Sequence, residues 1–220
     1  MLNVTNGEHQ AGPRAGERKQ AMDAIETLMN EHRLIERVLD ALVAFANDVR
    51  RRGATEKEEL GRFVTFVRSF ADACHHGKEE GVLFEAMVEH GFPRNGGPIA
   101  VMLREHDQGR GLVAVLKERA EQGGPWSDAD RQEIADVASG FSDMLHAHIH
   151  KEDAILYPMA EQHLPPEVMS RVTADCERFE AEQTGSGEHE RLHALADELV
   201  ARHASAVHPT QPSPRLGFCG

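Results

Sequence analysis

The sequence predicts an all-α protein, an up-down-up-down four-helix bundle followed by a C-terminal helical extension. Aromatic residues make up 5% of the 220 residues, and the apolar positions are mainly Leu, Val, Ala, Ile and Met, which is typical of helical bundles rather than β folds. Apolar residues recur at helical spacing in four successive segments. The pattern of the second segment also returns in the fourth, which indicates an internal repeat.

We divide the chain into four parts by composition. Residues 1–19 mix Gly, Pro, Arg and Gln with little apolar content, and we expect a disordered lead-in. Residues 20–163 are predicted to form the bundle and residues 164–203 the helical extension. The Pro-rich residues 204–220 are predicted to be a flexible tail.

The first two bundle helices have recognisable ends. The first is expected to stop at residues 50–53, where three Arg and a Gly are typical of a helix C-terminus, and His32 lies in its apolar stripe. The second is expected to start at Thr55, because Glu58 stands three residues later and the two can form a capping box. Its inward stripe contains His75 and Glu79.

The third and fourth helices follow Gly-rich loops. The third carries His106 and ends at residues 123–125, and Ser127 caps the fourth. Pro158 is expected to end or kink the fourth helix, and Tyr157 falls on a face that we expect to be solvated. The inward stripe is predicted to contain Ile134, Val137, Phe141, Leu145, His148, Glu152, Ile155 and Met159.

Two copies of one unit make up the bundle. Aligning Lys78 with Lys151 superposes a His-x-x-x-Glu of the second helix on one of the fourth, with an offset of 73 residues. A lone His preceded by Glu occurs one helix earlier in each copy, with an offset of 74 residues. On a helix, residues i and i+4 share a face with Cβ atoms ~5–6 Å apart, so a His and a Glu at this spacing can reach one metal or two adjacent ones.

The ligand types indicate a two-metal centre. Imidazole suits iron, zinc and copper, and carboxylates can bridge ions ~3.5–4 Å apart. A single tetrahedral zinc would leave the set over-supplied, whereas two metals use every member. The predicted ligands are His32, His75, Glu79, His106, His148 and Glu152.

A second pair, His76 and Glu80, has the same spacing but is rotated by ~100° on the helix. Only His75 and Glu79 match the repeat, so we choose them as ligands. We expect His76 and Glu80 to be additional ligands, hydrogen-bond partners of the ligands, or solvated groups, with the last two alternatives favoured.

The four motifs, in order, resemble the hemerythrin-like (HHE cation-binding) family. They are Glu31-His32, the run from His75 to Phe84, the run from Glu105 to Arg110, and the run from His148 to Pro158. The resemblance implies a non-haem di-iron centre with two irons per chain, carboxylate-bridged and compatible with an oxo or hydroxo bridge. It also implies His32, His75, His106 and His148 as terminal ligands, with Glu79 and Glu152 as bridges.

One position departs from the family pattern. Oxygen-carrying hemerythrins have a second His four residues after the third-helix His, where this chain has Arg110. Five histidines then become four, and simple reversible O2 carriage is less expected. Glu36, four residues after His32, is a candidate third carboxylate ligand or partner of Arg110, and an ordinary surface charge is the alternative.

Two functions from different classes remain open. The first is a protein that binds or senses O2, NO or iron, and the second is a di-iron oxidoreductase acting on O2, peroxide or NO. We favour the first, because no substrate pocket can be read from the sequence. Repair of iron-sulfur clusters is less expected, because no Cys-bearing domain precedes the bundle in this sequence.

A rival motif lies in the extension. His189-Glu190-Arg191-Leu192-His193 matches the His-Glu-x-x-His string of zinc peptidases, but such a site needs a third ligand, and only Glu198, His203 and His208 follow. With 14 His and 37 acidic residues the string is expected by chance. His189 could instead lean against the bundle behind the ligands. A ferritin-like centre needs two Glu-x-x-His pairs, and the chain has one.

Charge and cysteine content limit the partners and the compartment. A formal charge of −13 argues against binding nucleic acid or anionic lipid. Three Cys without a Cys-x-x-Cys argue against a disulfide framework and suit a reducing compartment. No apolar run approaches the ~18 residues of a membrane span, and the first residues are too polar for a signal peptide, so we expect a cytoplasmic protein. The expected partners are O2, NO or peroxide, and no protein partner is indicated.

Overall fold

The computed structural model describes residues 23–183 and 187–203, and within these ranges the secondary structure is entirely helical. The prediction of an all-α protein is therefore confirmed. The predicted lead-in and tail, residues 1–19 and 204–220, lie outside the described residues. No helix in the described ranges is both long and apolar enough to cross a membrane.

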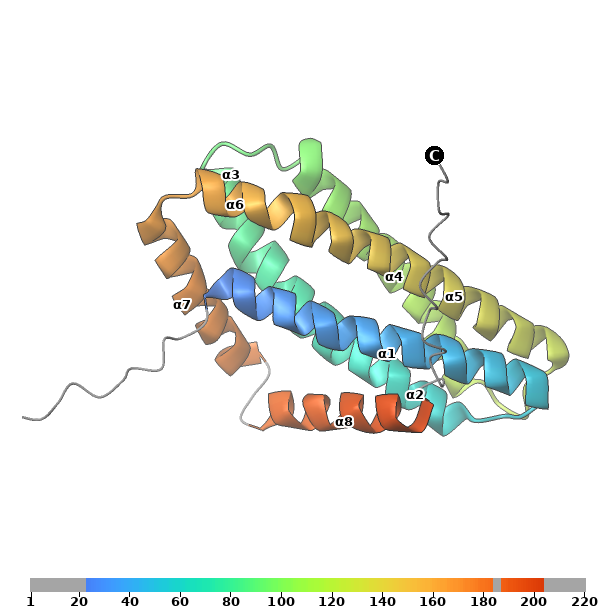
Figure 1. The fold of residues 1–220 in the computed structure, drawn as a ribbon. Coiled ribbons are helices and arrows are strands. Elements are labelled where there is room, and N and C mark those ends of the chain that lie inside the picture. The colour runs from blue at the N-terminus through green and yellow to red at the C-terminus, as the bar shows by residue number, and fades with distance from the viewer. Residues whose placement is uncertain (1–22, 184–186, 204–220) are drawn as a thin grey trace, which may run out of the picture.

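Four long helical rods, joined by short loops, run up and down to form the bundle (Figure 1). The first rod is α1 (Ala24–Arg52), and the third is α4 (Gly97–Glu121). The second comprises α2 (Lys57–Phe66), η1 (Val67–His76), η2 (Glu79–Leu83) and α3 (Phe84–Glu89). The fourth comprises α5 (Asp128–Lys151), η3 (Glu152–Leu156) and α6 (Tyr157–His163).

Local sequence explains most helix ends. Gly53 ends α1 with a φ of 67°, and Ser127 forms a capping box with Asp130 at the start of α5. The capping box predicted at Thr55 is wrong, since α2 begins at Lys57 without a side-chain cap. The Thr55 hydroxyl instead accepts a hydrogen bond of 3.1 Å from the backbone N–H of Trp126, which ties the α4–α5 loop to the start of α2.

Three π-helical stretches, η1, η2 and η3, interrupt the second and fourth rods. A π-helix closes i→i+5 hydrogen bonds, so a stripe assigned with the α-helical period fails beyond it. Two predictions for the fourth rod are wrong for this reason: Ile155 is 52% exposed, whereas Tyr157 is fully buried. This rod also does not end at Pro158 but continues to His163.

The core consists of two hydrophobic clusters with a polar layer between them. Along α1, Leu28 belongs to one cluster and Ile35 to the other, and His32 lies between them. Along the fourth rod, Ile149 and Leu156 flank Glu152 in the same way. The ligand-type residues therefore form a polar layer across the middle of the bundle.

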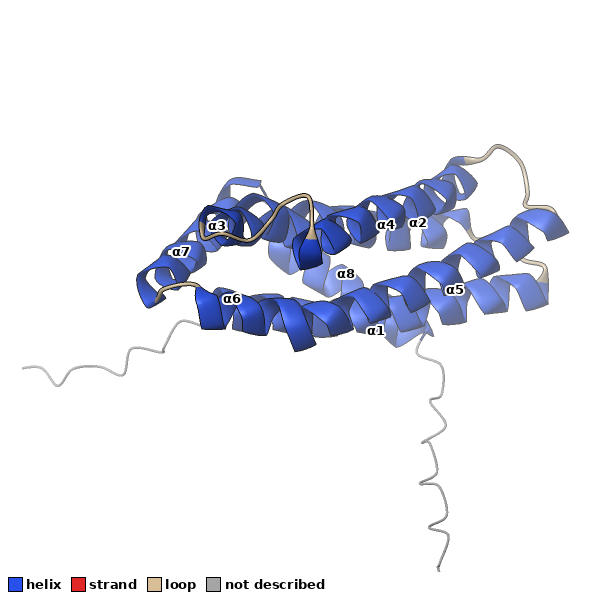
Figure 2. Ribbon diagram, turned by 90° about the horizontal axis from the view of Figure 1, so that it is seen from above, coloured by secondary structure: helices blue, strands red, loops and turns tan. Residues whose placement is uncertain are grey.

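The extension consists of α7 (Pro166–Gln183) and α8 (Glu188–His203), which pack against α1 and the second rod (Figures 1 and 2). Helix α7 adds Val172 to the first of these clusters, the one containing Leu28, and α8 adds Leu192 to the other. The fit of α7 on the second rod is close, because a Cβ at Gly77 would lie 2.6 Å from the Phe179 ring. The extension thus covers the face of the bundle that carries η1 and η2.

Candidate metal centre

Seven buried side chains, five imidazoles and two carboxylates, converge in the polar layer. They form two groups, each with ligand atoms within 4.8 Å of one another. The first group is His32, His75, Glu79 and Glu152, and the second is His76, Glu79, His106 and His148. The structure thus brings together all six predicted ligands and adds His76, while Glu79 belongs to both groups.

The two glutamates lie between the groups, and both are 0% exposed. Glu152 reaches both sides, since its Oε1 lies 3.1 Å from His148 Nε2 and its Oε2 lies 3.3 Å from His32 Nε2. Within the described residues, Oε2 of Glu79 and both oxygens of Glu152 accept no hydrogen bond. Buried carboxylate oxygens are costly when unpartnered, and a bound cation would supply the missing partner. The donor set therefore fits metal ions.

The π-helical stretches carry the ligands. His75 and His76 end η1, Glu79 begins η2, and Glu152 begins η3. Turns of this kind occur often at functional sites, since they alter which side chains face the interior. In η1 both consecutive histidines are buried, with exposed fractions of 1% and 8%. The solvated alternative for His76 is therefore wrong.

Each imidazole turns Nδ1 away from the centre and toward a carboxylate. A hydrogen bond between Nδ1 and a carboxylate fixes the ring orientation and makes Nε2 a better metal ligand. Four of the five contacts are short, and that of His76 is the longest. The Nδ1 atoms lie 2.7 Å from Asp153 for His32, 2.8 Å from Glu31 for His75, 3.4 Å from Asp72 for His76, 2.7 Å from Glu80 for His106 and 2.8 Å from Glu105 for His148.

The internal repeat extends to these supporting contacts. Glu31 accepts from His75 and pairs with Lys78, and Glu105 accepts from His148 and pairs with Lys151. Sequence reasoning did not assign Glu31 and Glu105 a role, although each directly precedes the lone His of its copy. The Glu-His pair that both copies share could have indicated this supporting role.

Two aligned positions differ between the copies. Tyr157 stands where the first copy has Phe84, and its hydroxyl donates a hydrogen bond of 2.7 Å to Oε1 of Glu79. Conversely, His76 stands where the second copy has Ile149, and its ring stacks on His106 with centroids 3.8 Å apart. At both positions the aligned repeat has a polar residue in one copy and an apolar residue in the other. This difference in the sequence could have indicated a role for Tyr157 and His76.

The fifth imidazole changes the expectation drawn from Arg110. The sequence suggested four histidines, but the structure gathers five, and the additional one comes from the residue next to His75. Arg110 itself belongs to neither group. It donates to Glu80 at 2.7 Å and to Asp72 at 2.8 Å, and these are the carboxylates behind His106 and His76.

Glu36 also lies outside both groups. Its carboxylate pairs with Arg33 at 3.1 Å, and the partners of Arg110 are Asp72, Glu80 and Asp107. Glu36 is therefore an ordinary surface charge, as one of the alternatives proposed. The expected pairing of Glu36 with Arg110 is wrong.

Burial and neighbouring charges move the pKa values of the two glutamates in opposite directions. Burial, and then the negative charge of Glu152, raises the pKa of Glu79 well above its ordinary value. Burial also acts against ionised Glu152, but its proximity to His148 and His32 outweighs this and lowers the pKa of Glu152. Burial depresses the pKa of His32, yet Asp153 and Glu152 raise it to about 9. A bound cation would displace these protons.

The extension places His189 in a separate group with Cys74 and Glu180, and His189 Nδ1 lies 2.9 Å from Glu180 Oε1. Glu190 is exposed, and His203 pairs instead with Glu59 at 2.8 Å. Among the described residues, His189 and His193 therefore share no three-ligand group of the kind a zinc peptidase requires.

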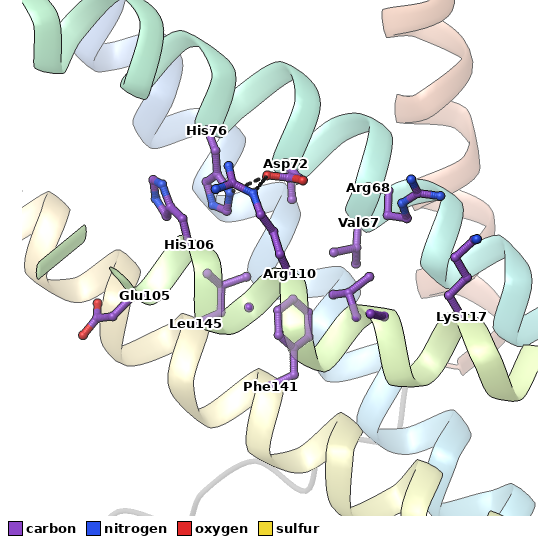
Figure 3. A pocket seen from close by; sticks show the side chains of 14 residues that line it. Val67, Arg68, Asp72, His76, Glu105, His106, Arg110, Lys117, Phe141 and Leu145 are labelled. Atoms are coloured by element: carbon purple, nitrogen blue, oxygen red, sulfur yellow. Dashed lines mark hydrogen bonds and ion pairs between the residues drawn. The ribbon is translucent and has the colours of Figure 1, made fainter. Parts of the chain in front are cut away.

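A pocket of about 330 Å³ lies against the second group (Figure 3). His76 and His106 stand at one end, and Arg68 and Lys117 stand at the other. Between them the walls are largely apolar, with Phe141 and Leu145 contributed by α5. The second group is thus reached from this side of the bundle.

Comparisons with known proteins bear on this geometry. The profile of the family described as "Hemerythrin HHE cation binding domain" matches residues 23–160. The Iron-sulfur cluster repair protein YtfE of Musicola paradisiaca (strain Ech703) is 36% identical over 90 residues. That alignment covers 39% of this chain and 40% of the relative, so the chain matches less than half of the relative's length. No solved structure matches the chain.

Proposed function

The chain belongs to the hemerythrin HHE cation-binding family and is a metal-binding protein, and from this premise we propose that it holds two iron ions and binds or senses O2 or NO through them. The observation that carries the proposal is the pair of buried four-residue groups that share Glu79. Imidazole and carboxylate donors suit iron, and such a centre supplies ligand binding and electron exchange.

The proposed ligands follow from the two groups. His32 and His75 would hold one ion, and His76, His106 and His148 the other, with Glu79 and Glu152 between them. In this arrangement one ion would have two imidazoles and the other three. An exogenous ligand would therefore bind beside His32 and His75, where the chain supplies fewer imidazoles.

The surrounding residues prepare the site. The carboxylates behind the imidazoles fix the rings, and the two hydrophobic clusters exclude water from above and below the polar layer. Tyr157 holds a proton 2.7 Å from Glu79 and 3.4 Å from His32 Nε2, fully shielded from solvent. An anionic ligand bound on the His32 side would compete with Glu79 for this single hydrogen bond.

A second candidate function is a di-iron oxidoreductase acting on O2, peroxide or NO. The pocket against His76 and His106 favours it, because a reactant other than a diatomic gas would need such space. The alignment with the iron-sulfur cluster repair protein covers 40% of that relative, which is too little to carry its repair role over to this chain.

Metal stoichiometry tests the proposal. After anaerobic loading with Fe²⁺, elemental analysis should give two irons per chain, and His75→Ala or His76→Ala should each lower that value to about one. His150→Ala is the matched control, because His150 is an exposed residue near the end of α5. Saturation at one metal, with zinc preferred over iron, would contradict the di-iron centre.

The two candidate functions are separated by kinetics. A binding or sensing protein should give one stoichiometric spectral change when the reduced, iron-loaded form is mixed with NO or O2. Continuous turnover of peroxide or NO with an added reductant would instead establish the oxidoreductase.

A further inference from the structure

The pocket beside the second group has the shape of a slot. It lies between η1 and α4, with α5 as its floor (Figure 3). Along α4 it extends from His106 to Lys117, eleven residues apart, which corresponds to ~16 Å at the helical rise. Its volume of about 330 Å³ is near the lower end of ligand pockets. A long and narrow space of this kind suits a slender ligand.

The middle of the slot is apolar and depends on a glycine. Val113, Phe141 and Leu145 line it and are buried. At Gly109 a Cβ would lie 3.3 Å from Met144 Cε and 3.4 Å from the Phe141 ring, so a larger side chain would fill the space. The side chains of Val113, Phe141 and Leu145 carry no hydrogen-bonding group and favour an alkyl chain. Nearer His76, Arg110 and Asp72 also line the slot, and they are paired with each other.

The outer end of the slot is positively charged. Among the described residues, Arg68 has no carboxylate within ion-pair distance, and Lys117 has Glu121 at 3.3 Å on the same helix. The acidic residues that line the slot are already paired: Asp72 with Arg110, and Glu105 with Lys151. A positive outer end is thus maintained in a chain with a formal charge of −13.

The inner end of the slot meets His76. This imidazole is 8% exposed and lies beside His106, which is 1% exposed, and both rings line the slot. The far end of a ligand in the slot would therefore contact the His76 ring rather than the buried glutamates.

We propose that this slot binds a straight-chain monocarboxylate. The carboxylate lies at Arg68 and Lys117, the alkyl chain passes over Gly109, and the chain end lies against His76. The guanidinium of Arg68 presents two parallel donors, which match the two oxygens of a carboxylate. This goes beyond the proposed function, since the slot would bind this ligand whichever metal the centre holds.

Isothermal titration of the iron-loaded protein with octanoate tests the proposal, with 1-octanol, octylammonium and octyl phosphate as comparisons. Octanoate should bind at least tenfold more tightly than 1-octanol and octylammonium. Arg68→Glu should weaken octanoate binding at least tenfold. Equal affinity for 1-octanol, or tighter binding of octyl phosphate, would overturn the assignment of a carboxylate.

A matched pair of glycine variants locates the ligand. Gly109→Leu should abolish octanoate binding because it fills the slot, whereas Gly111→Leu should leave binding unchanged. Gly111 lies two residues further along α4, and a Cβ there would meet no atom within 4 Å. Ala114→Phe, at an exposed residue that lines the slot, should also abolish binding without altering the core. Wild-type affinity in Gly109→Leu or Ala114→Phe would overturn the proposal.

Iron content measured on the same samples keeps the two proposals apart. A variant that loses octanoate binding but keeps its full iron content has lost the function of the slot alone. A shortfall in iron with octanoate binding intact concerns the metal centre alone.

Discussion

The two copies of the repeat build the same chain of contacts behind a histidine, but they place it in different surroundings. In the first copy Lys78 pairs with Glu31, which accepts from His75, and Lys78 is 1% exposed because α7 covers it. In the second copy Lys151 pairs with Glu105, which accepts from His148, but the Lys151 side chain is 34% exposed. The sequence repeat therefore determines which contacts form, and the elements packed over these contacts determine how much each contributes to stability.

The comparison extends to access. Helix α7 closes the first copy, where Glu180 adds a second partner for Lys78 at 3.0 Å. On the other side, Glu105 and His106 line the pocket. One side of the polar layer is therefore covered by the extension, and a pocket borders the other side.

The largest expected effect comes from removing the two lysines. Lys78→Met leaves the Glu31 charge buried and without its cation, which should lower the free energy of unfolding by about 3–5 kcal/mol. Lys151→Met removes a partly exposed pair and should cost at most about 1 kcal/mol. Urea denaturation of both variants measures the difference, and equal losses would show that α7 does not set the weight of these pairs.

Exchanging the two aligned aromatic residues is expected to have the next largest effect. Tyr157→Phe removes the donor to Glu79 and leaves a buried oxygen unpartnered, which should cost about 1–3 kcal/mol. Phe84→Tyr, the reciprocal change at the aligned position, should destabilise by burying a hydroxyl in an apolar cluster. Only Tyr157→Phe should also change the absorption spectrum of the iron-loaded protein, and an unchanged spectrum would place Tyr157 outside the ligand-binding side.

Gly77 and Gly81 of the first copy face α7, and substitutions there test how tightly α7 packs. A Cβ at Gly77 would lie 2.6 Å from the Phe179 ring, so Gly77→Ala must displace that ring, and we expect a net loss of about 1–2 kcal/mol. Gly81→Ala would place its Cβ 3.8 Å from the same ring and should stabilise by up to about 1 kcal/mol through helix propensity. Thermal unfolding of both variants measures whether each substitution raises or lowers stability. A Gly77→Ala variant as stable as the wild type would indicate that α7 packs loosely.

The smallest effect is a pH dependence at Glu180. The hydrogen bond from His189, and then the positive charge of Lys78, lowers the pKa of Glu180 to about 2. A lowered carboxyl pKa gives stability that is present above the ordinary value of ~4.3 and is lost as the pH falls toward about 2. Because Glu180 is half-buried, we expect Glu180→Gln to cost about 1 kcal/mol at pH 6 and less at pH 3. Glu177→Gln, an exposed control on α7, should show no such trend.

Much of the fold could be predicted from the sequence, because apolar spacing and the repeat are local signals. The all-α fold and the family follow from them, and the structure brings all six predicted ligand residues together. Three of the predictions that failed, for Ile155, Tyr157 and a solvated His76, concern the π-helical rods. Those predictions assumed the α-helical period of 3.6 residues, which does not hold through a π-helical turn. Two others, the capping box at Thr55 and the pairing of Glu36 with Arg110, failed because each group has another partner in the fold. The seal over Lys78 likewise depends on Glu180, a residue 102 positions away along the chain.

The chain contains one tyrosine and one tryptophan, and the fold has placed them in different environments. Tyr157 contacts the polar layer through its hydrogen bond to Glu79. Trp126 is buried in the α4–α5 loop, and its indole N–H donates to the Arg119 carbonyl at 2.8 Å. The protein therefore carries two built-in optical probes. Tryptophan emission reports unfolding at the loop end of the bundle, and ultraviolet difference absorption of the single phenol reports events at the centre, so metal release and unfolding can be followed separately without any added label.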